Sequence, residues 1–311
     1  MRRQKTINMK LFNKAINIER HNAIKIMRHK KALKIINIKN IKNIINIRKY
    51  LEVFRISFKM QITWRFDVVM TMVATIARIV AAWILWRAIF DGREIVGGFT
   101  FETMLSYYVI SSIINSINFS NQISGEVAFL IKDGGFSKHM VTPMNPMGFF
   151  GSMVSGESAF HLSFSLLAAV FCAVAFRADI VFATNAAQVF IAFLLILLGL
   201  CFMVGYHFFV GVMAFKFFDI GFFTHVQESI IGFVTGSMIP LSLLPGGVVN
   251  VLRYLPFTHV VYTPAMLLTG QTGAAGGLIG LCVLSSWTVA MLAVAQTAYT
   301  KMRLRYDGVG I

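Results

Sequence analysis

The sequence is poor in charged residues, which make up 14% of its 311 residues, whereas soluble domains carry about 25%. Hydrophobic residues make up 57% of it. A chain with so few charges has too little polar surface for an ordinary soluble enzyme. The composition therefore predicts a polytopic membrane protein that lies in a lipid bilayer.

Cysteine is also scarce, and its positions exclude two kinds of site. Cys172, Cys201 and Cys282 all lie in apolar stretches, away from the polar or paired neighbours that disulfides and thiolate metal sites need. No group of His, Asp, Glu or Cys in the sequence has metal-ligand spacing. We expect no metal site, no cofactor and no catalytic residue.

A nucleotide-binding motif and a hydrolase motif are also missing. The sequence has no Gly-x-x-x-x-Gly-Lys-Ser/Thr loop, which would cradle nucleotide phosphates, and no serine nucleophile elbow. We therefore expect a non-catalytic membrane subunit. If ATP drives its activity, a partner chain must bind and hydrolyse that ATP.

Six long apolar stretches follow one another from about residue 68. They cover residues 68–90, 104–121, 155–176, 186–211, 224–244 and 274–298. Most reach the ~20 residues that a helix needs to cross the hydrocarbon core. The second contains several Ser and Asn residues, which suit packing against other helices. The sequence predicts an all-α protein with six transmembrane helices in the domain 68–311.

The net charge of +16 comes from one end of the chain. Residues 1–50 hold fifteen Lys and Arg and a single acid, and the rest is nearly neutral, so we expect no nucleic-acid partner. For the basic leader, residues 1–47, disorder, an amphipathic helix on an anionic membrane and a mis-assigned start all stay open.

Residues 48–67 have a different pattern, with apolar residues at helical intervals between basic ones. Val53, Ile56, Met60 and Trp64 form this apolar series. The pattern predicts an interfacial elbow helix before the first span, or else a cytoplasmic extension of that span.

The distribution of Lys and Arg predicts the orientation of the spans. The N-terminal flank, the second loop with Lys132 and Lys138, and the C-terminal tail are basic, whereas the first loop is acidic. Both termini and the second loop are therefore expected in the cytoplasm. Arg78 lies in the middle of the first span, where a charge costs ~2.5–3.5 kcal/mol, and is a candidate for a path-lining or paired position.

The second loop has the features of a docking surface. Val127, Leu130 and Ile131 share one face of a short amphipathic helix that Gly134 ends, which suits a groove on a soluble partner, although an ordinary connecting loop would have the same features. Prolines then keep the chain extended. The predicted coupling residues are Glu126, Val127, Leu130, Ile131, Lys132, Gly134, Phe136, Lys138, Pro143, Asn145 and Pro146.

Four stretches carry a resemblance to a known family. They are RISFKMQITWRFD at 55–67, GGFSKHMVTPMNP at 134–146, IPLSLLPGGVVNVLRYLPFTHVVYTPAMLLTGQ at 239–271 and RYDGVGI at 305–311. Over residues 48–311 the chain resembles the membrane permease subunit of ABC transporters of the exporter type-2 family, in an uncharacterised branch. Lys216 departs from it, because the family more often has an aromatic residue there.

The resemblance implies ATP-driven export across a bacterial plasma membrane by two permeases, identical or homologous. A separate ABC ATP-binding subunit would dock on the second loop of each. Residues 239–271 would form a re-entrant outer element, consistent with prolines that prevent a continuous helix. Its predicted residues are Pro240, Pro245, Gly246, Arg253, Tyr254 and Pro256. A secondary transporter or a membrane assembly subunit, neither of which needs an ATPase, stays open.

Overall fold

The computed structural model describes residues 47–63, 65–117, 121–175, 180–217, 220–237 and 239–305. The predicted leader and the stretch 305–311 lie almost wholly outside the described residues. The chain divides into two compact units, Met1–Leu51 and Glu52–Ile311. The described part of the first unit is helical, and the apolar helices belong to the second.

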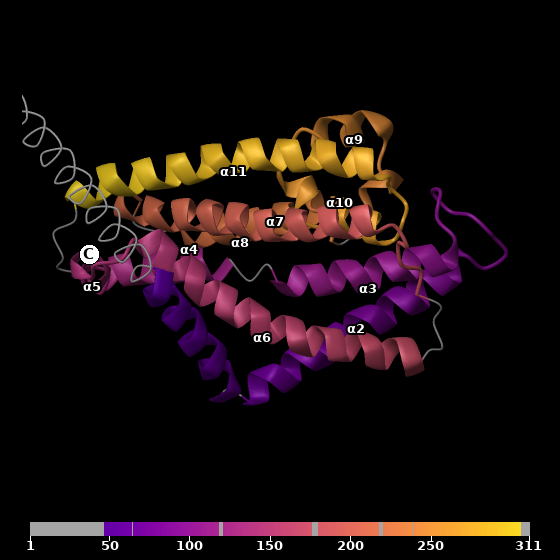
Figure 1. The fold of residues 1–311 in the computed structure, drawn as a ribbon, viewed down its shortest axis with the longest axis horizontal. Coiled ribbons are helices and arrows are strands. Elements are labelled where there is room, and N and C mark those ends of the chain that lie inside the picture. The colour runs from indigo at the N-terminus through magenta and orange to yellow at the C-terminus, as the bar shows by residue number, and fades with distance from the viewer. Residues whose placement is uncertain are drawn as a thin grey trace, which may run out of the picture. The chain divides into compact units, whose positions relative to one another are not determined.

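The second unit is built from α-helices and short 3-10 turns, without a strand in its described residues (Figure 1). The all-α prediction is confirmed. In chain order the elements are α2 (Arg65–Ile89), α3 (Phe101–Ile117), α4 (Asn121–Lys132), α5 (Ser137–Val141), α6 (Pro146–Ala175), α7 (Ala186–Val212), η1 (Met213–Phe215), α8 (Gly221–Val234), η2 (Leu241–Leu243), α9 (Gly246–Leu252), η3 (Phe257–His259), α10 (Tyr262–Leu268), α11 (Ala274–Met302) and η4 (Arg303–Arg305).

Within the residues that the structure describes, four segments are long and apolar enough to cross a membrane: Met72–Ile89, Pro146–Ala175, Ala186–Phe215 and Ala274–Met302. They correspond to the predicted first, third, fourth and sixth spans, which makes this a multi-pass membrane protein. The outer faces of α6, α7 and α11 carry exposed apolar side chains that suit lipid, among them Leu167, Val170, Phe171, Phe190, Phe193, Ile279 and Val289.

The two remaining predicted spans are shorter helices. α3 has 17 residues. α8 has 14 residues, or about 21 Å of helix, against ~30 Å of hydrocarbon. The prediction of one helix over 224–244 is wrong, because the helix ends at Val234 and Gly236 follows with a φ of 77°. Pro240 then prevents α8 from continuing as one helix, because proline has no backbone N–H to donate.

The third span also begins earlier than predicted, at Pro146 instead of residue 155. Proline at the first helical position loses no intrahelical hydrogen bond, and its fixed φ favours the start of a helix. The backbone N–H of Met147 donates to the Asn145 Oδ1 at 3.0 Å. The end of the second loop is therefore the beginning of a 30-residue helix.

α7 is the central helix of the fold and packs against α11, α4, α10 and α6. Figure 1 shows α7 and α11 side by side along most of their lengths. α2, α3 and α6 pack on one another as a second group. Gly211 of α7 brings α4 close, because a Cβ there would lie 2.8 Å from the Cβ of Val127.

The segment predicted as an elbow is helical through residues 47–63. Its part within the second unit packs on α6. A Cβ at Gly156 would collide with the backbone oxygen of Phe54, and the rings of Phe58 and Phe160 are 5.5 Å apart. Ile56 and Met60 are exposed. Its position at a membrane interface stays a prediction.

Candidate functional site

The predicted coupling loop, residues 124–146, lies within a segment that consists of α4, the glycine pair after it, and α5. We call residues 121–146 the coupling segment. Gly134 has a φ of 76° and ends α4, as predicted. Beyond it the backbone N–H of Phe136 donates to the carbonyl of Leu130 at 2.9 Å. This turn folds α5 back beside the end of α4.

The apolar face of α4 lies inside the protein. Val127 and Ile131 are 0% exposed and pack with Ile123 in the core that α4 shares with α6, α7 and α11. The prediction that these two side chains meet a partner is therefore wrong. A helix must bury its apolar face, and α7 covers that face of α4. The third predicted residue, Leu130, is half-buried.

The side of the segment that faces outward is different from the predicted one. Phe129, on the opposite side of α4 from Val127, is 65% exposed, and Val141 at the end of α5 is 85% exposed. Lys138, which lies between these two residues in the chain, and Pro143, which follows Val141, are also exposed. We call Phe129, Lys138, Val141 and Pro143 the coupling surface.

Phe136 anchors the coupling surface to the rest of the molecule. Its side chain is fully buried, with ring centroids 5.5 Å from Phe215 of η1 and 6.1 Å from Tyr299 of α11. The neighbouring His139 packs on Phe149 of α6 at 4.9 Å. Burial, and secondly the charge of Lys138, lower the pKa of His139, so it is neutral at pH 7.

Asn145 provides a second anchor. Its Oδ1 caps α6, and its Nδ2 donates to the Oε1 of Gln296 in α11 at 3.1 Å. Pro146 is buried at the start of α6. The structure thus places Phe136, Asn145 and Pro146, all predicted as coupling residues, as the connections between the coupling segment and two long helices.

Two carboxylates lie behind the coupling surface. Glu126 of α4 and Glu157 of α6 are half-buried and near enough to interact electrostatically. Burial raises the pKa of Glu126 above its ordinary value. Lys132, the other charged coupling residue, is half-buried at the end of α4.

The predicted outer element, residues 239–271, is a series of short helices: η2, α9, η3 and α10. Pro240 and Pro256 are buried, whereas Pro245 and Gly246 are exposed before and at the start of α9. Arg253 and Tyr254 follow α9, and both side chains are exposed. The prolines interrupt the helix as predicted, but whether this element enters the membrane stays a prediction.

His259 holds the outer element together. Its Nε2 is 2.9 Å from the carbonyl oxygen of Arg253, and its Nδ1 is 2.8 Å from the Oγ1 of Thr263. The side chain packs against α11 at Gly280, where an added Cβ would lie 2.8 Å from Nδ1. Trp287 of α11 also donates its indole N–H to the carbonyl of Tyr254 at 3.0 Å.

The coupling segment and the outer element therefore meet the same helix at opposite ends (Figure 1). The outer element contacts α11 at Gly280 and Trp287, and the coupling segment contacts it at Gln296 and Tyr299. About 28 Å of helix separates Gly280 from Tyr299. α11 therefore contacts both elements.

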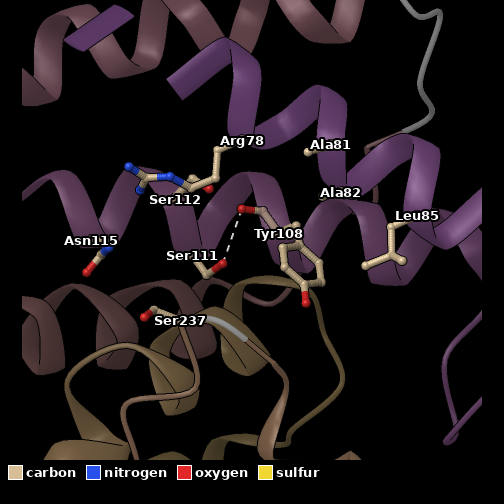
Figure 2. Close-up of a pocket in the computed structure, with 9 residues that line it drawn as sticks. All are labelled: Arg78, Ala81, Ala82, Leu85, Tyr108, Ser111, Ser112, Asn115 and Ser237. Atoms are coloured by element: carbon tan, nitrogen blue, oxygen red, sulfur yellow. Dashed lines mark hydrogen bonds between the residues drawn. The ribbon is translucent and has the colours of Figure 1, made fainter. Parts of the chain in front are cut away.

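Arg78 lies in the middle of α2 and lines a pocket of about 530 Å³ between α2 and α3 (Figure 2). The other lining residues are Ala81, Ala82, Leu85, Tyr108, Ser111, Ser112, Asn115 and Ser237. The polar residues of the second predicted span, α3, thus line a pocket in addition to packing against helices.

Sequence reasoning missed three features of these sites. Phe129 is recognisable as an apolar residue out of phase with the buried face of α4. His259 has its partners Arg253 and Thr263 six and four residues away in the chain, but the residue types alone do not indicate these contacts. Val141 follows the apolar Met140 directly, and the sequence does not indicate which of the two is exposed.

A family model described as an ABC-2 family transporter protein matches residues 76–310. The match includes α3 to α11, with both the coupling segment and the outer element. No curated protein matches the chain significantly.

Proposed function

Since the chain belongs to the ABC-2 family of transporter proteins, we propose that it is the permease subunit of an ABC transporter and that ATP hydrolysis in a partner chain drives export through it. The partner is an ABC ATP-binding subunit that docks on the coupling surface. The observation that carries this proposal is the firm anchoring of that surface by Phe136 and Asn145 to α6, η1 and α11.

The anchoring matters because a docked motor must transmit its motion to the spans. Close-packed side chains transmit a displacement with little loss, since protein interiors have low compressibility. A push on α5 therefore moves Phe136 against Tyr299 of α11. The contacts of α11 with His259 and Tyr254 then extend that motion to the outer element, as in a two-state shift of packed helices.

Several finer features belong to the same proposal. Two permeases, identical or homologous, form a dimer in a bacterial plasma membrane, with both termini and the coupling surface in the cytoplasm. α3 and α8 act as the second and fifth spans, and residues 239–271 form a re-entrant outer element. The exposed Ile56 and Met60 suit an elbow helix in the headgroup layer.

The test is co-purification of the ATP-binding subunit with the tagged chain in mild detergent, followed by an ATPase assay. Phe129→Asp and Val141→Asp are expected to leave the chain folded and to reduce the bound ATPase at least tenfold, because each places a carboxylate at the centre of an apolar contact. Ile95→Asp is the matched control, an exposed apolar residue of the loop between α2 and α3 that should retain the ATPase.

A folded chain that never co-purifies with an ATPase would contradict the proposal and favour a secondary transporter or an assembly subunit. Equal loss of ATPase in Ile95→Asp and Val141→Asp would contradict the assignment of the docking surface. Val127→Asp is expected to prevent folding, because it buries an unpaired charge, and so gives no information on docking.

A further inference from the structure

A single arginine of the candidate span Met72–Ile89, Arg78, lines the pocket between α2 and α3. Within the part of the chain whose side chains are described, no carboxylate lies within ion-pair distance of Arg78. A charge inside a bilayer is expensive unless a counter-charge or water accompanies it. The pocket therefore presents a positive charge that an anionic occupant would balance.

Hydrogen-bond donors surround this charge on one side of the pocket. Figure 2 shows the guanidinium of Arg78 near Ser112 and Asn115, on the polar face of α3. The hydroxyl of Ser111 is not among these donors, because it donates to the carbonyl of Tyr108 at 3.1 Å. Guanidinium, amide and hydroxyl donors together match the oxygens of a phosphate or carboxylate.

The other end of the same pocket is apolar. Ala82 and Leu85 lie one and two turns further along α2, and the ring of Tyr108 faces them from α3 (Figure 2). The ring of Trp86 packs against this Tyr108, with the two ring centroids 5.8 Å apart. The pocket thus combines an anion-binding end with an apolar end, at a volume typical of small-molecule sites.

We propose that this pocket binds an amphiphile with an anionic headgroup, whose phosphate or carboxylate pairs with Arg78 and whose apolar part lies along Ala82 and Leu85. The assignment of this class of molecule as the transported substrate rests on the proposed function. The binding itself does not, so it can be measured without a partner chain.

The experiment measures quenching of Trp86 fluorescence in the full chain, with Trp64, Trp83 and Trp287 replaced by Phe. The chain is reconstituted in phosphatidylcholine with a minor fraction of brominated phosphatidylglycerol, or of brominated phosphatidylcholine as the neutral probe. The anionic probe is expected to quench more strongly. Arg78→Gln should weaken its binding roughly 10- to 100-fold, as expected for loss of hydrogen bonds to a charged group, and Arg78→Lys should retain most of it.

Arg87→Gln is the matched control, because Arg87 is on the same helix and lies outside this pocket. Equal quenching by the two probes, or an equal loss in Arg87→Gln, would overturn the proposal. Competition by inorganic phosphate as effective as that by the lipid would also overturn it, in favour of a free-anion site. A changed oligomeric state of Arg78→Gln with unaltered lipid selectivity would instead identify Arg78 as an ion-pair partner of a second copy.

The quenching measurement needs no ATPase partner, so loss of that partner leaves the quenching unchanged. Anionic selectivity without any co-purifying ATPase would therefore support the pocket and contradict the proposed function. An associated ATPase with no anionic selectivity would contradict the pocket alone.

Discussion

The side chain of Asn145 makes hydrogen bonds at the start of α6. Its amide oxygen satisfies a backbone N–H of α6 that has no intrahelical partner, and its amide nitrogen reaches Gln296 of α11. One residue of the coupling segment thus fixes both where α6 begins and how it sits against α11.

Asn145→Ala is expected to destabilise the protein by ~1 kcal/mol, because the cap is lost. The midpoint of thermal unfolding in detergent should fall by about 2–4 °C. Asn145→Asp keeps the capping oxygen and is expected to retain most of the stability. An unchanged midpoint in the alanine variant would show that the cap contributes nothing.

Glu126 makes the stability of the coupling segment dependent on pH. Burial disfavours its charged form, so its pKa in the folded protein lies above the ordinary value of 4.5. The contribution of protonated Glu126 to the free energy of unfolding is fully present below that ordinary value. It is lost as the pH rises through the raised pKa. Deprotonation therefore destabilises the folded protein.

Glu126→Gln is accordingly expected to raise the thermal midpoint at pH 7 and to flatten its dependence on pH above the ordinary carboxyl range. Glu94→Gln, at an exposed position of the loop between α2 and α3, is the matched control and should leave the profile unchanged. A profile of Glu126→Gln identical to that of the unaltered protein would contradict the burial of this carboxyl group.

At the scale of helices, α4 and the helix 47–63 are both positioned by glycines of the helices that receive them. Gly211 of α7 lets Val127 of α4 approach, and Gly156 of α6 lets the backbone of Phe54 approach. Small residues allow helices in membrane proteins to pack closely when lipid removes the usual hydrophobic drive.

Gly156→Ala is expected to displace the helix 47–63 from α6, because the new methyl group meets the backbone oxygen of Phe54. Limited proteolysis should then cut within this helix faster than in the unaltered protein. Gly125→Ala is the control, since nothing lies within 4 Å of its added Cβ, and it should stabilise α4 by about 0.5–1 kcal/mol. Equal proteolysis in all three proteins would contradict the packing of this helix on α6.

At the scale of the whole unit, the coupling segment and the outer element occupy opposite ends of α11. If α11 crosses the membrane, the two elements must lie on opposite sides of it. The exposed positions Val141 and Asn250 report the two sides.

In a background with Cys172, Cys201 and Cys282 replaced by Ala, single cysteines at positions 141 and 250 allow this to be measured. A membrane-impermeant maleimide on intact cells is expected to label position 250 and to reach position 141 only after permeabilisation. The reverse pattern would contradict the proposed orientation, and labelling of both from outside would contradict the crossing of α11.

The amino-acid sequence by itself determined the helical class, four of the long apolar helices, the end of α4 at Gly134 and the interruption by prolines after α8. Each of these follows from local composition or from a backbone preference of Gly or Pro. The family was also recognisable from linear motifs, because such motifs are local in the chain.

Only the tertiary structure decided which helix covers the apolar face of each neighbouring helix. The apolar side of α4 shows that Val127 and Ile131 must be buried, but it does not distinguish α7 from a second polypeptide. The packing of His259 on Gly280, the meeting of Arg78 with α3, and the shared contacts along α11 join residues far apart in the sequence. Such contacts depend on how whole helices pack, which no local pattern encodes.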